Sequence, residues 1–179
     1  EKVYVSIPQS KTYVVKPTDF HGLIPKLTVK EGDSVKSGST LFTDKYNERV
    51  KFSSPVSGKV ASIVRGAKRK IMEIVLQPDA EIKYETFQKS SAKDLSRDQI
   101  IEQLLSSGVW PFIRQRPFDV VANPSDMPKA IFISTFNTGP LSADNDFVLH
   151  GLENEFQNGL EIISKLTDGV LHLNVDGDT

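Results

Sequence analysis

The sequence predicts an α+β protein with three parts: an all-β domain, a helical connector and the beginning of an α/β domain. Short alternating runs separated by glycine and proline continue as far as residue 78. A helical spacing of apolar residues begins near Ser96, and from Ala130 onward an apolar strand, a helix and a second apolar strand follow in turn. We place the three parts at residues 1–88, 89–117 and 118–179.

The first domain is predicted to be built from short strands. Glycine turns at Gly32 and Gly58 lie between alternating runs, and this arrangement predicts two similar hairpins. Two such hairpins indicate a small β unit with quasi-two-fold symmetry, the pattern of a barrel-sandwich hybrid (biotinyl/lipoyl-like) domain. The expected strands are residues 3–7, 12–15, 25–29, 40–43, 50–52, 59–64 and 71–76.

The connector is predicted to contain one capped helix. Ser96 and Gln99 have the spacing of a capping box, and Gly108 suits the position just past the helix end. An apolar stripe follows the helical period at Ile100, Ile101, Leu104, Leu105 and Trp110. The three prolines between residues 114 and 128 predict an irregular connection.

The last third is predicted to be a βαβ unit with a parallel strand pair. Its strands are residues 130–134 and 170–175, and its helix is residues 155–166, with Phe156, Leu160, Ile163 and Leu166 at helical spacing. An isolated βαβ unit buries little surface. We therefore expect the sequence to be a segment of a longer protein, trimmed at both ends, with its α/β domain incomplete.

Composition and charge exclude several kinds of site. The 179 residues include no cysteine, so disulfides, thiolate metal sites and cysteine-held iron–sulfur clusters are excluded for this sequence. Residues 1–90 hold 16 Lys and Arg against 10 Asp and Glu, whereas residues 91–179 hold 6 against 13. The cations of the first part mostly alternate along strands, which indicates solvated surface. Residues 65–70 are the exception, with four cations in six residues.

No catalytic or metal-ligating residue is predicted. Dinucleotide and phosphate-loop motifs are missing, and His21, His150 and His172 match no metal-ligand spacing. Lys45 follows Thr43 and Asp44 as a lipoyl-lysine does, but its distance from Gly32 differs from that in lipoyl domains, and we predict that it is neither lipoylated nor biotinylated. The acidic run at residues 142–146 lacks the pattern of a calcium loop and suits a loop or a helix start.

Aromatic and arginine side chains also gather near the connector. Trp110, Phe112 and Phe118, with Arg114 and Arg116, could provide a stacking surface for nucleic acid or quinone. We favour the alternative, in which these residues pack the connector between domains.

Several blocks of the sequence, taken in order, resemble one family. They are residues 26–38, 41–45, 50–59, 65–69, 130–141 and the helix around 156–160. Together they are similar to the NqrA family, the A subunit of the Na⁺-translocating NADH:quinone reductase. The related C subunit of the Rnf electron-transport complex shares the barrel-sandwich domain but normally adds cysteine clusters, which this sequence lacks.

The resemblance implies a peripheral subunit of a membrane respiratory complex that passes electrons from NADH to ubiquinone and pumps Na⁺. It implies that this chain binds no cofactor itself, that the flavins and an iron–sulfur centre belong to other subunits, and that the chain contributes to quinone-site organisation or to assembly of the subunits. Expected partners are the other subunits, with ubiquinone as a candidate substrate, and neither nucleic acid nor a membrane span of its own is expected. The expected location is the cytoplasmic face of the bacterial inner membrane.

Within that complex, Arg65, Lys68 and Arg69 are our candidate docking residues. We expect the isolated chain to be inactive. Three alternatives stay open. The first is a non-catalytic carrier domain of another multi-subunit enzyme, which a fixed mass increment would reveal, and the second is a protein like the C subunit of the Rnf complex. The third is a nucleotide- or nucleic-acid-binding module that uses residues 65–70 and weakens steeply with salt.

Overall fold

The computed structural model describes residues 3–177, which divide into two compact units. We call Ile7–Gln88 with Ile101–Pro124 the barrel-sandwich unit. We call residues 89–100 and 125–177, together with residues 3–6, the α/β unit. Helix α1 (Arg97–Ser106) runs across the boundary between them in sequence.

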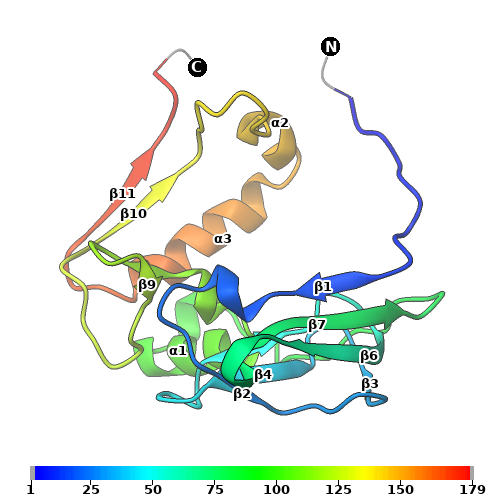
Figure 1. The fold of residues 1–179 in the computed structure, drawn as a ribbon. Coiled ribbons are helices and arrows are strands. Elements are labelled where there is room, and N and C mark those ends of the chain that lie inside the picture. Colours follow the sequence, from blue (N-terminus) through cyan, green and yellow to red (C-terminus); the bar gives the residue numbers. More distant parts are fainter. Residues whose placement is uncertain (1–2, 178–179) are drawn as a thin grey trace. The chain divides into compact units, whose positions relative to one another are not determined.

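Two antiparallel sheets form the barrel-sandwich unit (Figure 1). One sheet has the strand order β1-β7-β6-β3 and the other the order β2-β4-β5. The strands are β1 (Tyr13–Val15), β2 (Pro25–Leu27), β3 (Ser34–Val35), β4 (Thr40–Asp44), β5 (Lys51–Ser53), β6 (Gly58–Arg65) and β7 (Ile71–Pro78). Six of the seven expected strands are therefore present, with a short β3 added.

The core of this unit comes from inward-facing residues of both sheets. Phe42 and Phe52 stack with ring centroids 4.6 Å apart, and Phe20 meets Phe52 edge-on at 4.6 Å. Aromatic pairs at this separation add packing energy to the area that they bury. The other core side chains that are at most 5% exposed include Leu41, Val50, Val56, Val60, Ile74 and Leu76.

The predicted hairpins at Gly32 and Gly58 were wrong. Strand β2 pairs with β4 and β3 pairs with β6, so the turn at Gly32 carries the chain from one sheet to the other. Gly58 is the first residue of β6, and β5 before it pairs with β4 instead. The hairpins are β4–β5 and β6–β7, because in a two-sheet unit a glycine turn also serves where a strand changes sheets.

The connector contains the predicted helix with its predicted cap. Ser96 Oγ accepts from the backbone N–H of Gln99, and Gln99 Oε1 accepts from that of Ser96. Gly108 follows the helix end with φ +74°. Trp110 is 4% exposed and begins a 3₁₀ turn, Trp110–Phe112, and its indole Nε1 donates to Ala122 O at 2.7 Å. The connection expected to be irregular contains a small hairpin, β8 (Arg114–Gln115) with β9 (Val120–Val121).

The α/β unit has the predicted βαβ order. Strands β10 (Ala130–Ser134) and β11 (Val170–Asn174) pair in parallel, and α3 (Glu153–Ser164) lies between them in sequence (Figure 1). A short helix, α2 (Asn145–Leu149), was not predicted. Its N-cap is Asp144, whose Oδ1 accepts from Phe147 N at 2.9 Å, so the acidic run at 142–146 does begin a helix.

Lys165 joins the end of α3 to the segment before α1 in the α/β unit. Its Nζ donates to the carbonyl oxygens of Ala92, Lys93 and Leu95 at 2.6, 3.1 and 2.9 Å. An ammonium group has three donors and no acceptor, so all three are satisfied here.

Residues 3–7 do not form the predicted strand. Tyr4 instead stacks on Phe147 at 4.7 Å, and its hydroxyl donates to Phe147 O at 3.1 Å. An alternating run becomes a strand only where a neighbouring strand edge takes its backbone hydrogen bonds, and no edge within residues 3–177 pairs with this run.

Candidate functional site

The candidate docking residues lie in the loop of the long β6–β7 hairpin. Strands β6 and β7 have eight residues each and pair over most of their length. We call residues 65–70, from the last residue of β6 to the residue before β7, the basic loop. Every residue in it is exposed, including Arg65, Lys68, Arg69 and Lys70. The buried start of β7 at Ile71, 8% exposed, fixes the loop to the core of the unit.

The backbone of the basic loop is closed by short-range hydrogen bonds. Gly66 N donates to Lys70 O at 2.8 Å, and Lys70 N donates to Ala67 O at 3.1 Å. The Arg65 Nη1 atom donates to Arg69 O at 3.4 Å. The loop is therefore a defined turn, and the guanidinium of one of its arginines takes part in closing it.

Two adjacent residues of the basic loop have left-handed backbone conformations. The φ angles are +53° at Lys68 and +61° at Arg69. This region is disfavoured for residues with a Cβ atom and is usually occupied by glycine or asparagine. The conformation orients two long cationic side chains from consecutive positions of a turn.

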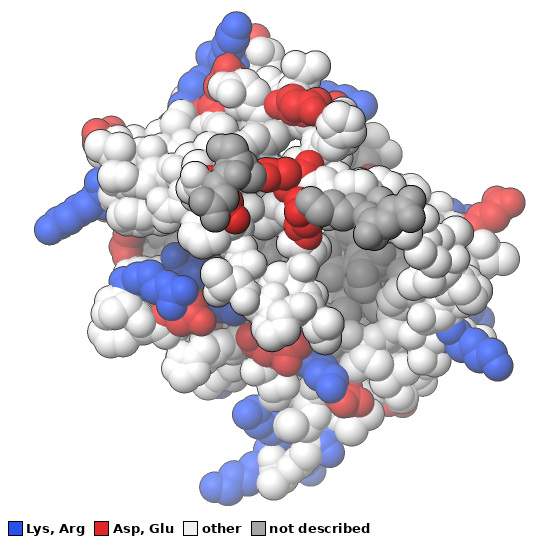
Figure 2. Space-filling model, turned by 90° about the horizontal axis from the view of Figure 1, so that it is seen from above, with Lys and Arg blue, Asp and Glu red and all other residues white. Residues whose placement is uncertain are grey.

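No ion pair joins the cations of the basic loop to a carboxylate within residues 3–177. The nearest acidic residue in sequence, Glu73, pairs with Lys16 at 3.5 Å. On the face drawn in Figure 2, Lys and Arg side chains are scattered among Asp and Glu around the edge, and several gather at the lower edge of the view. In the sequence, the basic loop has four cations within six residues.

Lys45 lies in the β4–β5 loop, where a carrier domain displays its modified lysine. The Lys45 side chain is exposed, and its backbone N donates to Ile24 O at 2.8 Å. Further along the same loop, Glu48 forms an ion pair with Lys26, and Arg49 forms one with Glu102. These contacts fix the shape of the loop and leave the Lys45 ammonium group in solvent.

An open pocket of about 250 Å³ lies beside this loop within the barrel-sandwich unit. Val50 and Tyr46 line it from the loop, and residues 121–124 line it from the segment after β9. Asp44, Asn47 and Asn123 add polar atoms to the wall. The titratable residues of this wall, Asp44 and Tyr46, are two residues apart in sequence.

The aromatic residues of the connector are split by burial. Trp110 is buried within the barrel-sandwich unit at 4% exposed, whereas Phe112 and Phe118, which we expected to pack the connector, are 76% and 72% exposed. The Arg114 guanidinium lies 5.3 Å from the ring centroid of Phe20 and donates from Nη2 to Asp19 O at 3.5 Å. Arg114 is therefore used within the unit, by a cation–π contact that joins segments far apart in sequence.

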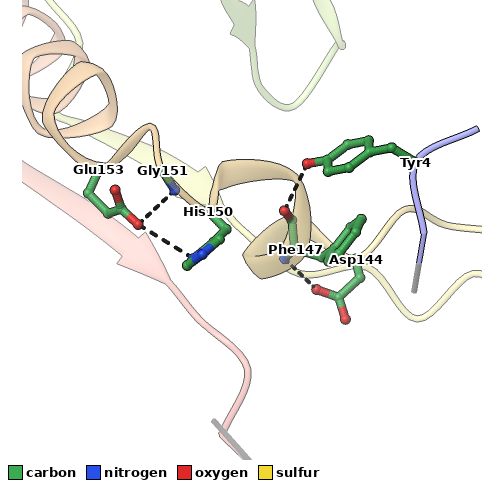
Figure 3. Close-up of polar contacts among 6 residues, drawn as sticks. All are labelled: Tyr4, Asp144, Phe147, His150, Gly151 and Glu153. Carbon is green, nitrogen blue, oxygen red and sulfur yellow. Dashed lines mark hydrogen bonds and ion pairs between the residues drawn. The ribbon is translucent and has the colours of Figure 1, made fainter. Parts of the chain in front are cut away.

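A polar corner joins α2 to α3 in the α/β unit (Figure 3). Glu153 Oε1 accepts from Gly151 N at 2.9 Å and lies 3.8 Å from His150 Nδ1. The pKa of the Glu153 carboxyl is lowered, and the largest cause is the hydrogen bond from the backbone N–H of Gly151. The backbone N–H of Glu153 itself is the next cause, and the charge of His150 also lowers this pKa. The carboxylate lies at the start of α3, where helix N–H groups stabilise negative charge, so the corner has a structural explanation.

Two properties of the described residues limit the kinds of site. Residues 3–177 contain no group of three His, Cys, Asp or Glu placed to hold a metal ion. The three histidines are not buried, and His172 stacks on Phe132 with ring centroids 4.5 Å apart. Over the same residues, no helix has the length and apolar character needed to cross a membrane. The candidate functional features are the exposed basic loop, the exposed Lys45 and the exposed Phe112 and Phe118.

Comparison with known proteins identifies two domains of one family in this chain. Residues 1–79 match the model of the NqrA N-terminal barrel-sandwich hybrid domain. Residues 95–179 match the model of the NqrA second alpha/beta domain. The first match covers the two sheets of the barrel-sandwich unit, and the second covers β10, α3 and β11. The second match also includes residues 101–124, which pack with the barrel-sandwich unit.

Three curated proteins that are similar to this chain have the same name, the A subunit of the Na(+)-translocating NADH-quinone reductase. The protein from Alcanivorax borkumensis is 38% identical over 164 residues, which cover 90% of this chain and 37% of the relative. The protein from Teredinibacter turnerae is 39% identical over 167 residues, 92% of this chain and 37% of the relative. The protein from Yersinia pseudotuberculosis is 38% identical over 157 residues, 87% of this chain and 35% of the relative. The chain thus spans little more than a third of the length of these relatives.

Proposed function

Because this chain belongs to the NqrA family, we propose that it serves as part of the NqrA subunit in a Na⁺-translocating NADH–quinone reductase. The observation that carries the proposal is the match of two NqrA domains, in order, to a chain that contains a two-sheet β unit followed by a βαβ unit. One matched domain alone would be weaker support, because barrel-sandwich folds serve many functions.

The role that we propose is assembly and quinone-site organisation, without a redox cofactor on this chain. Electron transfer between NADH and ubiquinone needs flavins and an iron–sulfur centre, and we assign these to other subunits of the complex. The absence of cysteine supports the assignment for the cluster, because thiolates are its usual ligands. Ubiquinone is a candidate ligand of the assembled complex.

The proposed location is the cytoplasmic face of the bacterial inner membrane, with the chain held there by its partner subunits. The family match supports association with a membrane complex. The structure offers surfaces for such contacts: the basic loop, and the exposed Phe112 and Phe118. Exposed aromatic side chains are enriched where proteins meet partners.

Co-purification from native membranes tests the proposed function. The full-length protein would carry an affinity tag, and mass spectrometry would identify the proteins that elute with it. We expect the other subunits of the reductase in fixed proportion, and loss of Na⁺-dependent NADH–quinone activity in membranes that lack this protein. Activity that is unchanged without it would refute the proposal.

The isolated chain gives a second, independent measurement. We expect no flavin absorption band and no NADH oxidation from the pure protein, because the cofactors that carry this chemistry are assigned elsewhere. A flavin spectrum or turnover by the pure chain would overturn the proposed division of roles.

A carrier function is the alternative, and the exposed position of Lys45 in the β4–β5 loop is the observation that favours it. Intact mass of the native protein decides between the two. We expect the unmodified mass, whereas a lipoyl or biotinyl increment located to Lys45 would establish the carrier.

A further inference from the structure

We propose that the basic loop, residues 65–70, is a preorganised docking element for an acidic protein surface on a neighbouring subunit. This inference rests on the proposed function, since it requires a complex in which such a neighbour exists. It goes further by naming the loop, the charge of the partner surface and the residues that carry the contact: Arg65, Lys68 and Arg69.

The basic loop has a closed and defined backbone shape. Lys68 and Arg69 both have positive φ, although glycine or asparagine would adopt this conformation with less strain. The hydrogen bonds Gly66 N to Lys70 O and Arg65 Nη1 to Arg69 O keep the turn closed. Positive φ at both central residues, with the hydrogen bond from Lys70 N to Ala67 O, is the pattern of a type I′ turn, a favoured tight connection in β-hairpins. The turn therefore holds two long cationic side chains at consecutive, fixed backbone positions.

The cations of the basic loop lie close together without a carboxylate partner. Four cations lie within six residues, and no carboxylate among residues 3–177 pairs with them. Cations held this close repel one another in the unbound protein. A partner that brings carboxylates removes the repulsion and adds attraction, so association relieves an unfavourable feature of the unbound loop.

The side chains and backbone of the basic loop bear on which kind of anion it binds. Arg65 and Arg69 carry guanidinium groups, whose planar fork matches a carboxylate or a phosphate through two parallel hydrogen bonds, so the shape of the loop has to distinguish the two. Contact with anionic lipid relies on nonspecific attraction by clusters of Lys and Arg next to a membrane helix or on an amphipathic helix. Here the cations lie on a fixed turn between two strands, with Lys68 and Arg69 at fixed backbone angles. A fixed spacing of cations favours a folded partner with a fixed spacing of Asp and Glu.

Fixed geometry also lowers the cost of binding. Ordering a flexible loop at an interface opposes association, and a turn already closed by its own hydrogen bonds avoids most of that loss. Complementary charge then acts mainly on the rate of association and on partner choice. Binding that depends on the loop should therefore weaken as ionic strength rises, because exposed charges are screened over about 8 Å at physiological salt.

The test is a charge reversal in the full-length protein, Lys68→Glu with Arg69→Glu. The matched control is Lys11→Glu with Lys59→Glu, which changes the net charge of the same unit equally at two exposed lysines outside the loop. Each protein is titrated onto membranes that contain the other subunits but lack this one, and the bound fraction gives the dissociation constant. Ionic strength is varied with KCl at constant Na⁺, so that Na⁺-linked effects stay fixed.

We expect the loop variant to bind at least about tenfold more weakly than wild type at low salt, with slower association, and the control to bind as wild type does. The difference between wild type and the loop variant should shrink as KCl is added. Both variants should unfold at the wild-type temperature, because every substituted side chain is exposed.

Three results would overturn the docking role. The loop variant could bind as tightly as wild type at low salt, or the two double variants could weaken binding equally. The third is loop-dependent binding of the wild-type protein to phosphatidylglycerol vesicles with no loop-dependent binding to the partner subunits. Failure of wild type to bind these membranes at all would instead refute the proposed function.

Discussion

Replacing Gly58 by alanine should strongly destabilise the barrel-sandwich unit. Gly58 begins β6 and pairs with Pro78 at the end of β7. A Cβ atom built on Gly58 would lie 1.9 Å from Gln77 O and 2.8 Å from Pro78 Cα, and both are backbone atoms. A backbone atom in a paired strand cannot rotate away as a side chain can, so the two strands would have to separate.

The size of the effect follows from two contributions. Ordinary contact begins near 3.4 Å, so the carbonyl of Gln77 would have to retreat by the difference from 1.9 Å, which is about 1.5 Å. Overpacking of this kind costs about 1–3 kcal/mol. A φ of +155°, a region that L side chains rarely adopt, adds about 1–3 kcal/mol. We expect a loss of about 4 kcal/mol, which lowers Tm by roughly 15–30 °C for a domain of this size.

Trp110 makes the measurement specific. It is the single tryptophan of the chain and is 4% exposed within the barrel-sandwich unit, so its fluorescence reports the unfolding of that unit alone. Urea titration followed at this signal gives the free energy of unfolding for the wild type and each variant.

Gly32→Ala is the matched control, because Gly32 has φ +90° but no atom within 4 Å of the built Cβ. Its cost should be limited to the backbone conformation, about 1–2 kcal/mol. The loss of unfolding free energy in Gly58→Ala, minus the loss in Gly32→Ala, then measures the cost of the contact with β7. Equal losses for the two variants, or a Gly58→Ala protein as stable as wild type, would show that the strand contact does not limit this position.

Three further predictions concern the α/β unit, each followed by far-UV circular dichroism or NMR. Gly159→Ala should stabilise the unit by up to about 1 kcal/mol, because the glycine lies within α3 with nothing within 4 Å of its Cβ position; a loss of stability would contradict this. Lys165→Met should destabilise it by about 2 kcal/mol, since three carbonyls lose a charged donor; an unchanged melting curve would show that water replaces the ammonium group. The pKa of the Glu153 carboxyl, followed by NMR, should lie below its ordinary value of 4.5. Its contribution to stability should then be fully present above pH 4.5 and be lost as pH falls through the lower pKa of the folded state. Glu153→Gln should remove this pH dependence, and a pKa at or above 4.5 would refute the prediction.

Features that depend on a few neighbouring residues were predicted well. The Ser96–Gln99 capping box formed as expected because both of its hydrogen bonds stay within four residues. The βαβ order was also confirmed, since β10, α3 and β11 each carry a clear apolar period. The helix α2 was missed because five residues are too few to show a period.

Features that depend on distant partners were predicted poorly. The run at residues 3–7 has the alternation of a strand, but whether it becomes one depends on an available strand edge, which sequence does not reveal. The hairpins at Gly32 and Gly58 failed for the same reason, since both positions lie where the chain changes sheets. Lys165 had no distinguishing signal, because its three carbonyl partners lie 70–73 residues away.

The basic loop lies between these two cases. Its composition is visible in the sequence, and four cations in six residues allowed a docking role to be weighed against an ordinary solvated loop. The left-handed conformations of Lys68 and Arg69 are visible only in the structure. Charge alone would fit any anion, including nucleic acid or lipid, because Coulomb attraction carries little shape information. A fixed backbone also sets the distances between the cations. A partner surface is selected when its carboxylates have matching distances, so the loop can distinguish one acidic protein surface from another.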